Sequence, residues 1–308
     1  MNFTLSQLKL FVKVVEKQSV TKASLELHMT QPAVSIQLKN FQDQFDIPLF
    51  EVVSRKIFIT PFGYEIADSA KEILLQAEVI KQKSMAFRGE LTGQLKISVV
   101  STGKYVMPHF LSEFIQLHKG IELSMDVTNK MKVIESLEKN EIDFALVSIL
   151  PENLNIETLD LMPNILHLVG NNEFNGSKKI TSKKLAKFPI IYRETGSGTR
   201  QSMEAFLFSK GIETFRKMDL TSNEAVKQAV ISGLGISIMP IIGLKHELEK
   251  KEVNIIPTQG LPIQTKWQLI WLKGKRHSPV VSSFLEYVNI HKEQIIEQKF
   301  SWYKKYIN

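Results

Sequence analysis

Apolar side chains in the first 45 residues recur at steps of three and four, the spacing of one helix face. They predict a first helix over about residues 5–15, with Thr4 or Ser6 available as its N-cap. Ser19 stands before a second, short helix and Thr30 before a third, so each of these has an N-cap candidate as well. The pattern therefore predicts three short helices with a tight turn between the second and the third.

The third predicted helix carries its polar residues away from its apolar ones. Its buried stripe consists of Val34, Leu38, Phe41 and Phe45. Its opposite side carries Gln31, Ser35, Lys39 and Gln42. Such a side either faces water or contacts another molecule, and the helix by itself does not distinguish the two.

A hairpin and a long helix are predicted next. The segment RKIFIT alternates, which indicates a small two-stranded hairpin with Arg55 and Lys56 near its tip. From Pro61 to about Arg88 a helix repeats apolar or small residues at alternating steps of four and three, as in a two-stranded coiled coil. This seam consists of Ile66, Ala70, Ile73, Ala77, Ile80, Ser84 and Phe87. A dimerisation helix fits the pattern, and a helix packed inside its own domain is the alternative.

Short apolar runs alternate with helical patterns in the rest of the chain. The first predicted strands cover residues 95–100, 122–127, 143–149 and 165–170. The runs FPIIYR, RKMDLT, GISIMP, VNIIP and KWQLIWL continue the pattern, and a helix from about Pro279 ends it. Strands that alternate with helices indicate an α/β architecture with a mainly parallel sheet.

Composition fits a folded protein of two or three domains. The chain has 308 residues, of which 43% are hydrophobic and 23% charged, so it can bury more than one core. It has no cysteine, which excludes disulfides and thiolate chemistry and fits a reducing cytoplasm. The pattern shows neither a signal peptide nor a run of about 20 apolar residues. A cytoplasmic protein without a membrane partner is expected.

The formal net charge of +7 suggests nucleic acid as a partner. However, residues 1–60 contain seven basic and five acidic residues, a surplus of only two. The total charge therefore does not locate a DNA site, and the placement of individual side chains must do so.

Three short helices followed by a basic hairpin are the parts of a winged helix-turn-helix, whose third helix lies in the major groove. There, Gln31 can make the paired contact that glutamine offers adenine, and Ala33 can meet a thymine methyl group. Ser35 and Lys39 can reach bases or phosphate. The candidate DNA-binding residues are Ser19, Thr21, Thr30, Gln31, Pro32, Ala33, Ser35, Lys39, Arg55 and Lys56.

The segment TKASLELHMTQPAVSIQLKNFQDQFDIPLFEVVSRKIFITPFG resembles the N-terminal domain of LysR-type transcriptional regulators. The resemblance rests, in order and spacing, on Thr21, Ala23, Leu27, Gln31, Pro32, Ala33, Val34, Ser35, Leu38, Pro48, Leu49, Phe50, Arg55, Thr60 and Gly63. It extends over essentially the whole chain. An all-α winged helix-turn-helix domain, a linker helix and a two-lobed α/β effector domain similar to periplasmic binding proteins are therefore expected.

The segment departs from the family pattern at four places. Val52 replaces an arginine of the wing, Phe41-Gln42 replaces Leu-Glu, Phe45-Asp46 replaces Leu-Gly, and Phe62 replaces a small residue. The loss of a wing arginine should weaken binding to the DNA backbone. It should also lower the salt dependence of DNA binding by the equivalent of about one phosphate contact.

Two loops combine hydroxyls, free backbone amides and a cation at the end of a predicted strand. One runs from Ser101 to Lys104 and the other from Thr195 to Arg200. In α/β domains, ligands bind at the carboxyl ends of strands, and helix N-termini attract anions. A carboxylate or phosphate would suit either loop. Ordinary helix capping is the alternative reading of the same residues.

The resemblance implies boundaries and partners. It predicts the DNA-binding domain at 1–61, the linker helix at 62–89 and the effector domain at 90–308, with lobe one at about 91–162 and 267–308 and lobe two at about 163–266. The implied effector residues are Ser101, Thr102, Lys104, Thr128, Asn129, Thr195, Gly196, Ser197, Gly198 and Thr199. The implied partners are promoter DNA, further copies of the chain in a dimer or tetramer, RNA polymerase and a small anionic co-inducer.

The segments RETGSGTR and TSNEAVKQAVISGLGISIMP are most similar to the branch that regulates carbon-fixation operons, whose effectors tend to be phosphorylated metabolites or nucleotides. Two other classes of protein are the alternatives. A solute-binding or transport protein would need a secretion signal and no DNA-binding segment. An enzyme has little support, because the seven histidines lack metal-ligand spacing and no P-loop or dinucleotide fingerprint is present, although spatially assembled triads stay open. No cofactor or metal is expected.

Overall fold

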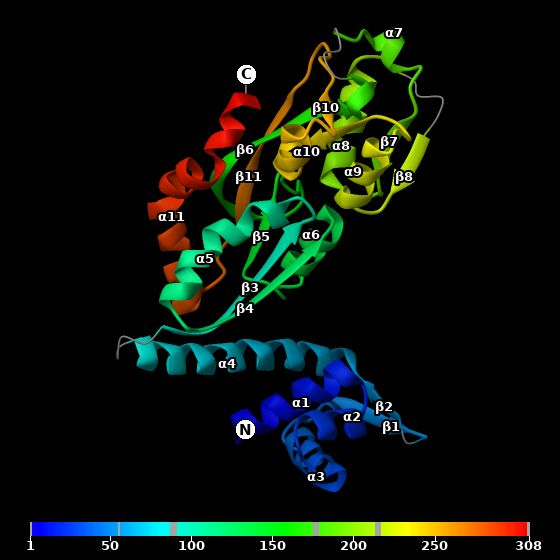
Figure 1. Ribbon diagram of the computed structural model, residues 1–308. Coiled ribbons are helices and arrows are strands. Elements are labelled where there is room, and N and C mark those ends of the chain that lie inside the picture. The colour runs from blue at the N-terminus through cyan, green and yellow to red at the C-terminus, as the bar shows by residue number, and fades with distance from the viewer. Residues whose placement is uncertain (1, 55, 87–90, 175–178, 213–216, 307–308) are drawn as a thin grey trace. The chain divides into compact units, whose positions relative to one another are not determined.

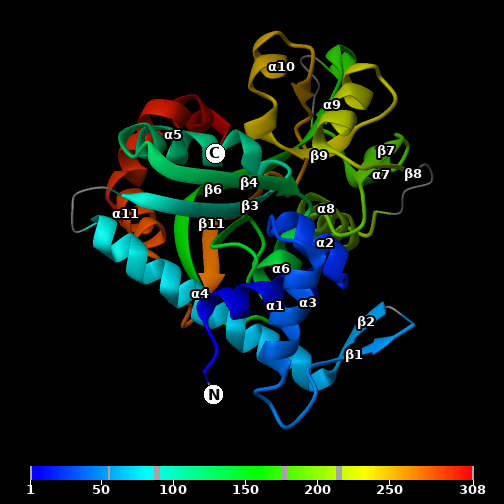
Figure 2. The ribbon, with the colours of Figure 1, turned by 90° about the horizontal axis from the view of Figure 1, so that it is seen from below.

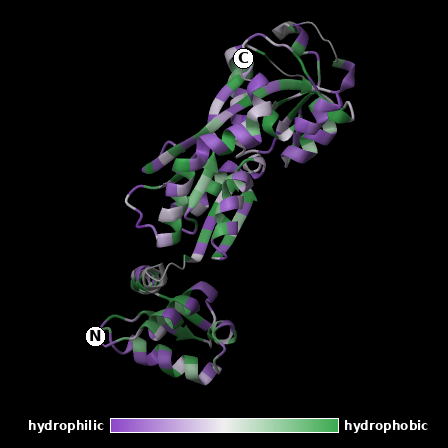
Figure 3. Ribbon diagram, turned by 60° about the vertical axis from the view of Figure 1, so that its left-hand side comes forward, coloured by the Kyte–Doolittle hydropathy of each residue, from purple (hydrophilic) through white to green (hydrophobic). Residues whose placement is uncertain are grey.

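The computed structural model describes residues 2–54, 56–86, 91–174, 179–212 and 217–306. It forms two compact units, 1–89 and 90–308 (Figure 1). In the part of the chain that is described, no helix is long and apolar enough to cross a membrane. Figure 3 accordingly shows hydrophilic and hydrophobic residues interleaved along the helices.

The first unit begins with the three predicted helices, α1 (Leu5–Lys17), α2 (Val20–Glu26) and α3 (Gln31–Gln42), as Figure 2 shows from below. Each is capped as the sequence predicted. The side-chain oxygens of Thr4, Ser19 and Thr30 accept hydrogen bonds of 3.2, 3.3 and 3.4 Å from the backbone N–H three residues further on. These caps satisfy amides that the first helical turn cannot pair.

Phenylalanine rings fill the core of this unit. Phe41 is fully buried, with its ring centroid 5.2 Å from that of Phe11 and 5.2 Å from that of Phe45. Phe45 in turn lies 6.2 Å from Phe62. Phe41, Phe45 and Phe62 are three of the departures from the family pattern, and they are neighbours in space. One aromatic cluster therefore accounts for all three substitutions together.

The wing consists of β1 (Phe50–Val53) and β2 (Lys56–Ile59), paired antiparallel. It leads into the long helix α4 (Pro61–Ala86). The Thr60 hydroxyl accepts a hydrogen bond from the Gly63 backbone (3.0 Å) and donates one to the Pro48 carbonyl (2.8 Å). A Cβ atom on Gly63 would lie 2.0 Å from the Leu49 carbonyl oxygen. The family's threonine and glycine thus fix where the hairpin meets the helix.

Helix α4 uses only part of its predicted seam within its own unit. Ala70 is buried in the core of the first unit, and Ile66 packs against that core. Ile73 and Ile80 are 42% and 70% exposed. The side chains of Ser84 and Phe87 lie outside the described residues. The first turns of the seam therefore pack inside their own unit, while Ile73 and Ile80 are left exposed, and a coiled-coil interface through them stays a prediction.

The second unit is built on a seven-stranded sheet. Its strands are β3 (Thr92–Val100), β4 (Gly120–Thr128), β5 (Phe144–Val147), β6 (Ile156–Gly170), β9 (Ser237–Pro240), β10 (Asn254–Ile255) and β11 (Ile263–Leu272). They follow the order β10-β6-β11-β5-β3-β4, with β9 also paired to β6. A separate parallel pair is formed by β7 (Ile190–Arg193) and β8 (Lys217–Leu220).

The expectation of a mainly parallel sheet is wrong for this unit. β3 is parallel to β4 and β5, but β11 is antiparallel to β5 and β6, and β6 is antiparallel to β9 and β10. The reason is that β6 carries the chain from one lobe to the other and β11 carries it back (Figure 1). Their pairing shifts register between Trp267, opposite Met162, and Gln268, opposite Asp160.

Helices cover both faces of the sheet. They are η1 (Gly103–Tyr105), α5 (Met107–Leu117), α6 (Lys130–Glu138), α7 (Ser182–Leu185), α8 (Gly198–Ser209), α9 (Asn223–Ile231), α10 (Lys245–Glu249) and α11 (Pro279–Phe300). Alternate residues of β5 point to opposite faces of the sheet, where they pack against different helices. Phe144 and Leu146 join a core with α5 and α11, whereas Ala145 and Val147 join a core with α6. A third core lies in lobe two, between β6, β7 and α8.

Replacing Phe41 by alanine should destabilise the first unit by about 3–5 kcal/mol, because a fully buried ring and its aromatic partners are lost. Hydrogen–deuterium exchange of the full chain should show faster exchange in α1 and α3 and unchanged exchange in the second unit. The control is Phe58→Ala, since Phe58 is 52% exposed. Equal protection of α3 in the two variants would contradict the assigned role of the aromatic cluster.

Candidate nucleic-acid interface and ligand cavity

The outward side of α3 is available to a partner. Gln31, Ser35 and Lys39 are exposed, and none of these side chains hydrogen-bonds or pairs with another of the described residues. They lie at steps of four residues and so share one side of the helix. Val34, Leu38 and Phe41, all buried, hold the other side against the core. This is the arrangement that presentation to a DNA groove requires.

The other predicted DNA-binding residues surround this side. Thr21, Thr30, Pro32 and Lys56 are exposed, and Ser19 and Ala33 are partly buried. The hydroxyls of Ser19 and Thr30 act as helix caps, so their part in DNA binding would be to orient α2 and α3. Arg55 lies outside the described residues.

Ile36 is a candidate that the sequence analysis missed. It is 60% exposed. It lies two residues after buried Val34, and at about 100° per residue this places its side chain about 200° around the helix from that of Val34. The spacing alone could therefore have predicted that Ile36 faces outward. An apolar side chain at this position suits the methyl group of thymine.

The wing exposes several apolar residues, one of which, Val52, stands where the family pattern has an arginine. Val52, Val53 and Phe58 are 64%, 53% and 52% exposed. Lys56 is its one described basic residue. Phosphate contacts by the described part of the wing would therefore depend on Lys56.

In the second unit, a small cavity of about 20 Å³ opens where several strands end. Its lining consists of Val100, Ser101, Thr102, Asn129, Lys130, Ser148, Ile149, Arg193, Ser197, Gly198 and Thr199. These residues follow β3, β4 and β5 of lobe one and end β7 or begin α8 of lobe two. Six predicted effector residues are thus brought together, namely Ser101, Thr102, Asn129, Ser197, Gly198 and Thr199.

Two largely buried hydroxyl residues of the cavity have no side-chain hydrogen-bond partner among the described residues. Thr102 and Ser197 are 4% and 6% exposed. Ser197 stands at the N-cap of α8, but its side chain makes no capping bond, and Thr102 likewise caps nothing. Both oxygens stay open to the cavity, since neither is among the sealed polar atoms of the described residues. A ligand in the cavity could therefore hydrogen-bond to them without displacing a protein group.

Two basic residues, Lys130 and Arg193, line the cavity, and none of the described residues that line it is acidic. The Arg193 guanidinium is 4% exposed and donates two hydrogen bonds, of 2.8 and 2.9 Å, to the neighbouring carboxylate of Glu194. Burial lowers the pKa of Lys130, because a charged amine loses hydration there, and the negative charge of Glu152 acts in the opposite direction. An anion in the cavity would compensate this amine.

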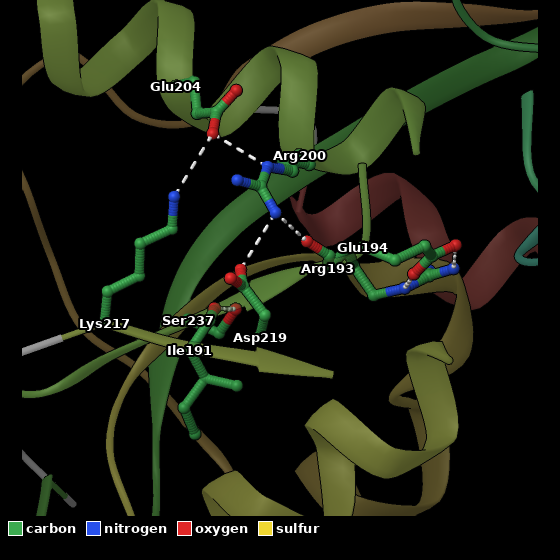
Figure 4. Close-up of polar contacts among 8 residues, drawn as sticks. All are labelled: Ile191, Arg193, Glu194, Arg200, Glu204, Lys217, Asp219 and Ser237. Carbon is green, nitrogen blue, oxygen red and sulfur yellow. Dashed lines mark hydrogen bonds and ion pairs between the residues drawn. The ribbon is translucent and has the colours of Figure 1, made fainter. Parts of the chain in front are cut away.

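A polar network holds the loop after β7 (Figure 4). Arg200 donates to the Arg193 carbonyl oxygen (2.9 Å), to Asp219 (2.9 Å) and to Glu204 (2.8 Å). Ser237 of β9 donates to the Ile191 carbonyl oxygen at 2.7 Å. These bonds fix the backbone that carries Arg193 and Ser197. Arg200, the cation of the predicted loop, is therefore occupied by protein groups.

Four predicted effector residues do not line this cavity. Thr195 and Gly196 line a separate, larger groove. Lys104 lies over the Tyr105 ring, 5.1 Å from its centroid, and Thr128 ends β4. Ser148, Arg193 and Lys130 take part instead and were not among the predicted effector residues. Ser148 and Arg193 stand at strand ends, the signal that located Ser101, so the same rule could have found them.

Two family models match the chain. One, described as a bacterial regulatory helix-turn-helix protein of the lysR family, matches residues 5–64, and the other, described as a LysR substrate binding domain, matches residues 88–291. The chain belongs to the LysR family. The winged head and the two-lobed α/β domain of this LysR-type regulator agree with that membership.

The resemblance to the carbon-fixation branch is supported by named relatives. The RuBisCO operon transcriptional regulator of Allochromatium vinosum is 35% identical over 290 residues, which are 94% of this chain and 96% of that protein. The HTH-type transcriptional activator CmpR of Synechocystis is 34% identical over 296 residues, 96% of this chain and 97% of that protein.

Solved structures share the fold. The regulatory domain of Synechocystis CcmR in complex with 2-PG is 32% identical, with a TM-score of 0.63, and the match covers 66% of this chain and 98% of that one. Full-length CbnR complexed with its target DNA is 22% identical, with a TM-score of 0.62, over 94% of this chain and 99% of that one. The second likeness concerns the fold alone.

If α3 of the LysR-type regulator reads bases and the wing contacts the backbone, Gln31→Ala and Lys56→Ala should differ. We expect Gln31→Ala to lose about 1–3 kcal/mol of discrimination between a selected target duplex and random DNA. Lys56→Ala should weaken both complexes about equally and reduce the salt slope by about one. Gel-shift titrations at several salt concentrations measure both effects. Equal losses on the two duplexes for Gln31→Ala would exclude base reading by that residue.

Proposed function

We propose that this LysR-type regulator binds promoter DNA as a dimer and is controlled by a small anionic effector bound between the two lobes of its second unit. The cavity carries this proposal: unpartnered hydroxyls on both lobes and two cations, without an acid in the lining, surround one small space. Pairing through α4 would place two heads on a twofold axis, matching half-sites in a roughly palindromic operator.

The donors of the cavity suit a carboxylate or a phosphate. α6 and α8 both begin at it, so their first amides and the positive ends of their dipoles lie beside the ligand. Lys130 adds a positive charge, whereas the charge of Arg193 is already paired with Glu194. The CcmR regulatory domain was solved with 2-PG, 2-phosphoglycolate, as its ligand, and such a molecule carries both anionic groups. This likeness supports a phosphorylated effector for the present chain.

Control by the effector requires different affinities for two arrangements of the protein. Because residues from both lobes line the cavity, a ligand that contacts both would favour the arrangement in which they are close. We propose that this preference alters how dimers pair on DNA and so changes transcription.

The exposed seam residues test dimerisation. Ile80→Glu should shift the full chain toward monomer in analytical ultracentrifugation, because a charge would have to be buried at the helix pair. The control is Leu75→Glu, since Leu75 is 45% exposed on α4 but off the seam. A dimer of unchanged stability in Ile80→Glu would contradict pairing through this helix.

The cavity residues test effector binding. Thermal-shift screening of the full chain with sugar phosphates, nucleotides and carboxylates should find a stabilising anion. Ser197→Ala and Thr199→Val should reduce that stabilisation, each weakening affinity by about 1–2 kcal/mol through a lost hydrogen bond, while DNA affinity without ligand stays the same. Ser202→Ala, on the same helix but outside the cavity lining, serves as the control. Unchanged ligand stabilisation in both cavity variants would rule these positions out.

A further inference from the structure

The larger groove and the cavity are neighbours that share part of their lining. It has a volume of about 710 Å³, against about 20 Å³ for the cavity, and lies between α6 of lobe one and α8 of lobe two. Lys130 and Ser197 line both spaces. Cavities hold about one water per 10–15 Å³ on this measure, whereas sites for drug-sized ligands reach 300–1,000 Å³. The inner space therefore accommodates only a small group, and any larger ligand has to extend into the groove.

Two hydrogen bonds join the lobes through residues that line the groove. The Met131 backbone N–H donates to the Gly196 carbonyl oxygen at 3.2 Å, and the Lys130 amine donates to the Gln201 side-chain oxygen at 3.1 Å. Gly196 has a φ of +87°, and a Cβ atom there would lie 3.1 Å from the Met131 Cβ. The close approach of the lobes is thus made at a glycine, and Lys130 is a residue that lines both spaces.

The chemistry of the two spaces differs. The inner one is lined by hydroxyls and cations. The groove has apolar walls formed by Met131, Ile134 and Pro151, and Met131 is 59% exposed. Three carboxylates also line the groove, at Glu135, Glu138 and Glu204, together with the cations Lys130 and Arg200, of which Arg200 is paired with Glu204 and Asp219. The inner space therefore suits an anionic group better than the groove does, and the walls of the groove suit an uncharged apolar body.

We infer that the effector is an amphipathic anion, with its phosphate or carboxylate in the cavity beside Lys130 and an apolar, ring-sized body in the groove against Met131 and Ile134. This inference rests on the proposed function and adds the size and polarity of the ligand to it. It makes Met131 a residue that selects for ligand size without contacting the anionic group.

Two probes that share one anionic group test this arrangement. Inorganic phosphate fills only the cavity, whereas 1-naphthyl phosphate adds an apolar ring system. Isothermal titration of the full chain should show about tenfold or greater preference for 1-naphthyl phosphate, as burial of the ring system implies. Met131→Ser, an exposed position that should leave folding intact, should reduce that preference about fivefold and leave inorganic phosphate binding unchanged.

A cavity variant separates the two proposals. Ser197→Ala should weaken both probes by a similar factor, because the anionic group is common to them. Equal affinity of the two probes for the wild type, or an unchanged preference in Met131→Ser, would overturn the extended ligand while leaving the anion cavity in place. Absence of binding by either probe would reject the cavity itself, and the extended ligand with it.

Discussion

The antiparallel pairing of β6 with β11 is the constraint on which the second unit depends. The two strands run side by side from Ile156 opposite Leu272 to Leu166 opposite Ile263, and they belong to the sheet of lobe one and to the core of lobe two. Because both crossings between the lobes lie in one hydrogen-bonded ladder, the lobes are held at a common edge. The cavity forms where the strands and helices of each lobe end beside the other lobe.

The two units place the polar groups of their candidate binding sites differently. In the first, a buried aromatic cluster holds α3 from behind, and its exposed side chains have no partners among the described residues. In the second, the polar groups proposed to bind the effector are themselves buried, and a network around Arg200 keeps their backbone in place. A long DNA surface can be read from outside, whereas a small anion has to be surrounded to be distinguished from others.

Short-range patterns in the sequence were sufficient to predict many of the helices and strands. Thr4, Ser19 and Thr30 cap the predicted helices because a cap depends on only three following residues. The start of β6 was missed by nine residues, since Pro163 interrupts the run and proline argues against a strand interior. The strand β11 was predicted from the run KWQLIWL, but its antiparallel direction was not, because periodicity carries no information about strand direction. Lys104 and Lys130 both follow a strand, and only the path of the chain after each one decides which amine reaches the cavity.

The register shift in the β6–β11 ladder has a consequence for how the chain tolerates change. Leu161 is the unmatched residue, because Trp267 is opposite Met162 and Gln268 is opposite Asp160. Deleting Leu161 would leave every other pair of the ladder opposite its partner, because it is the extra residue. Deleting a paired residue of β6 between Met162 and Leu166 would instead slip that half of the strand against β11. Such a slip exchanges the two faces of the strand, so Leu166 and Leu168 would leave the core of lobe two. A one-residue deletion should therefore be tolerated far better at Leu161 than at its paired neighbours in β6.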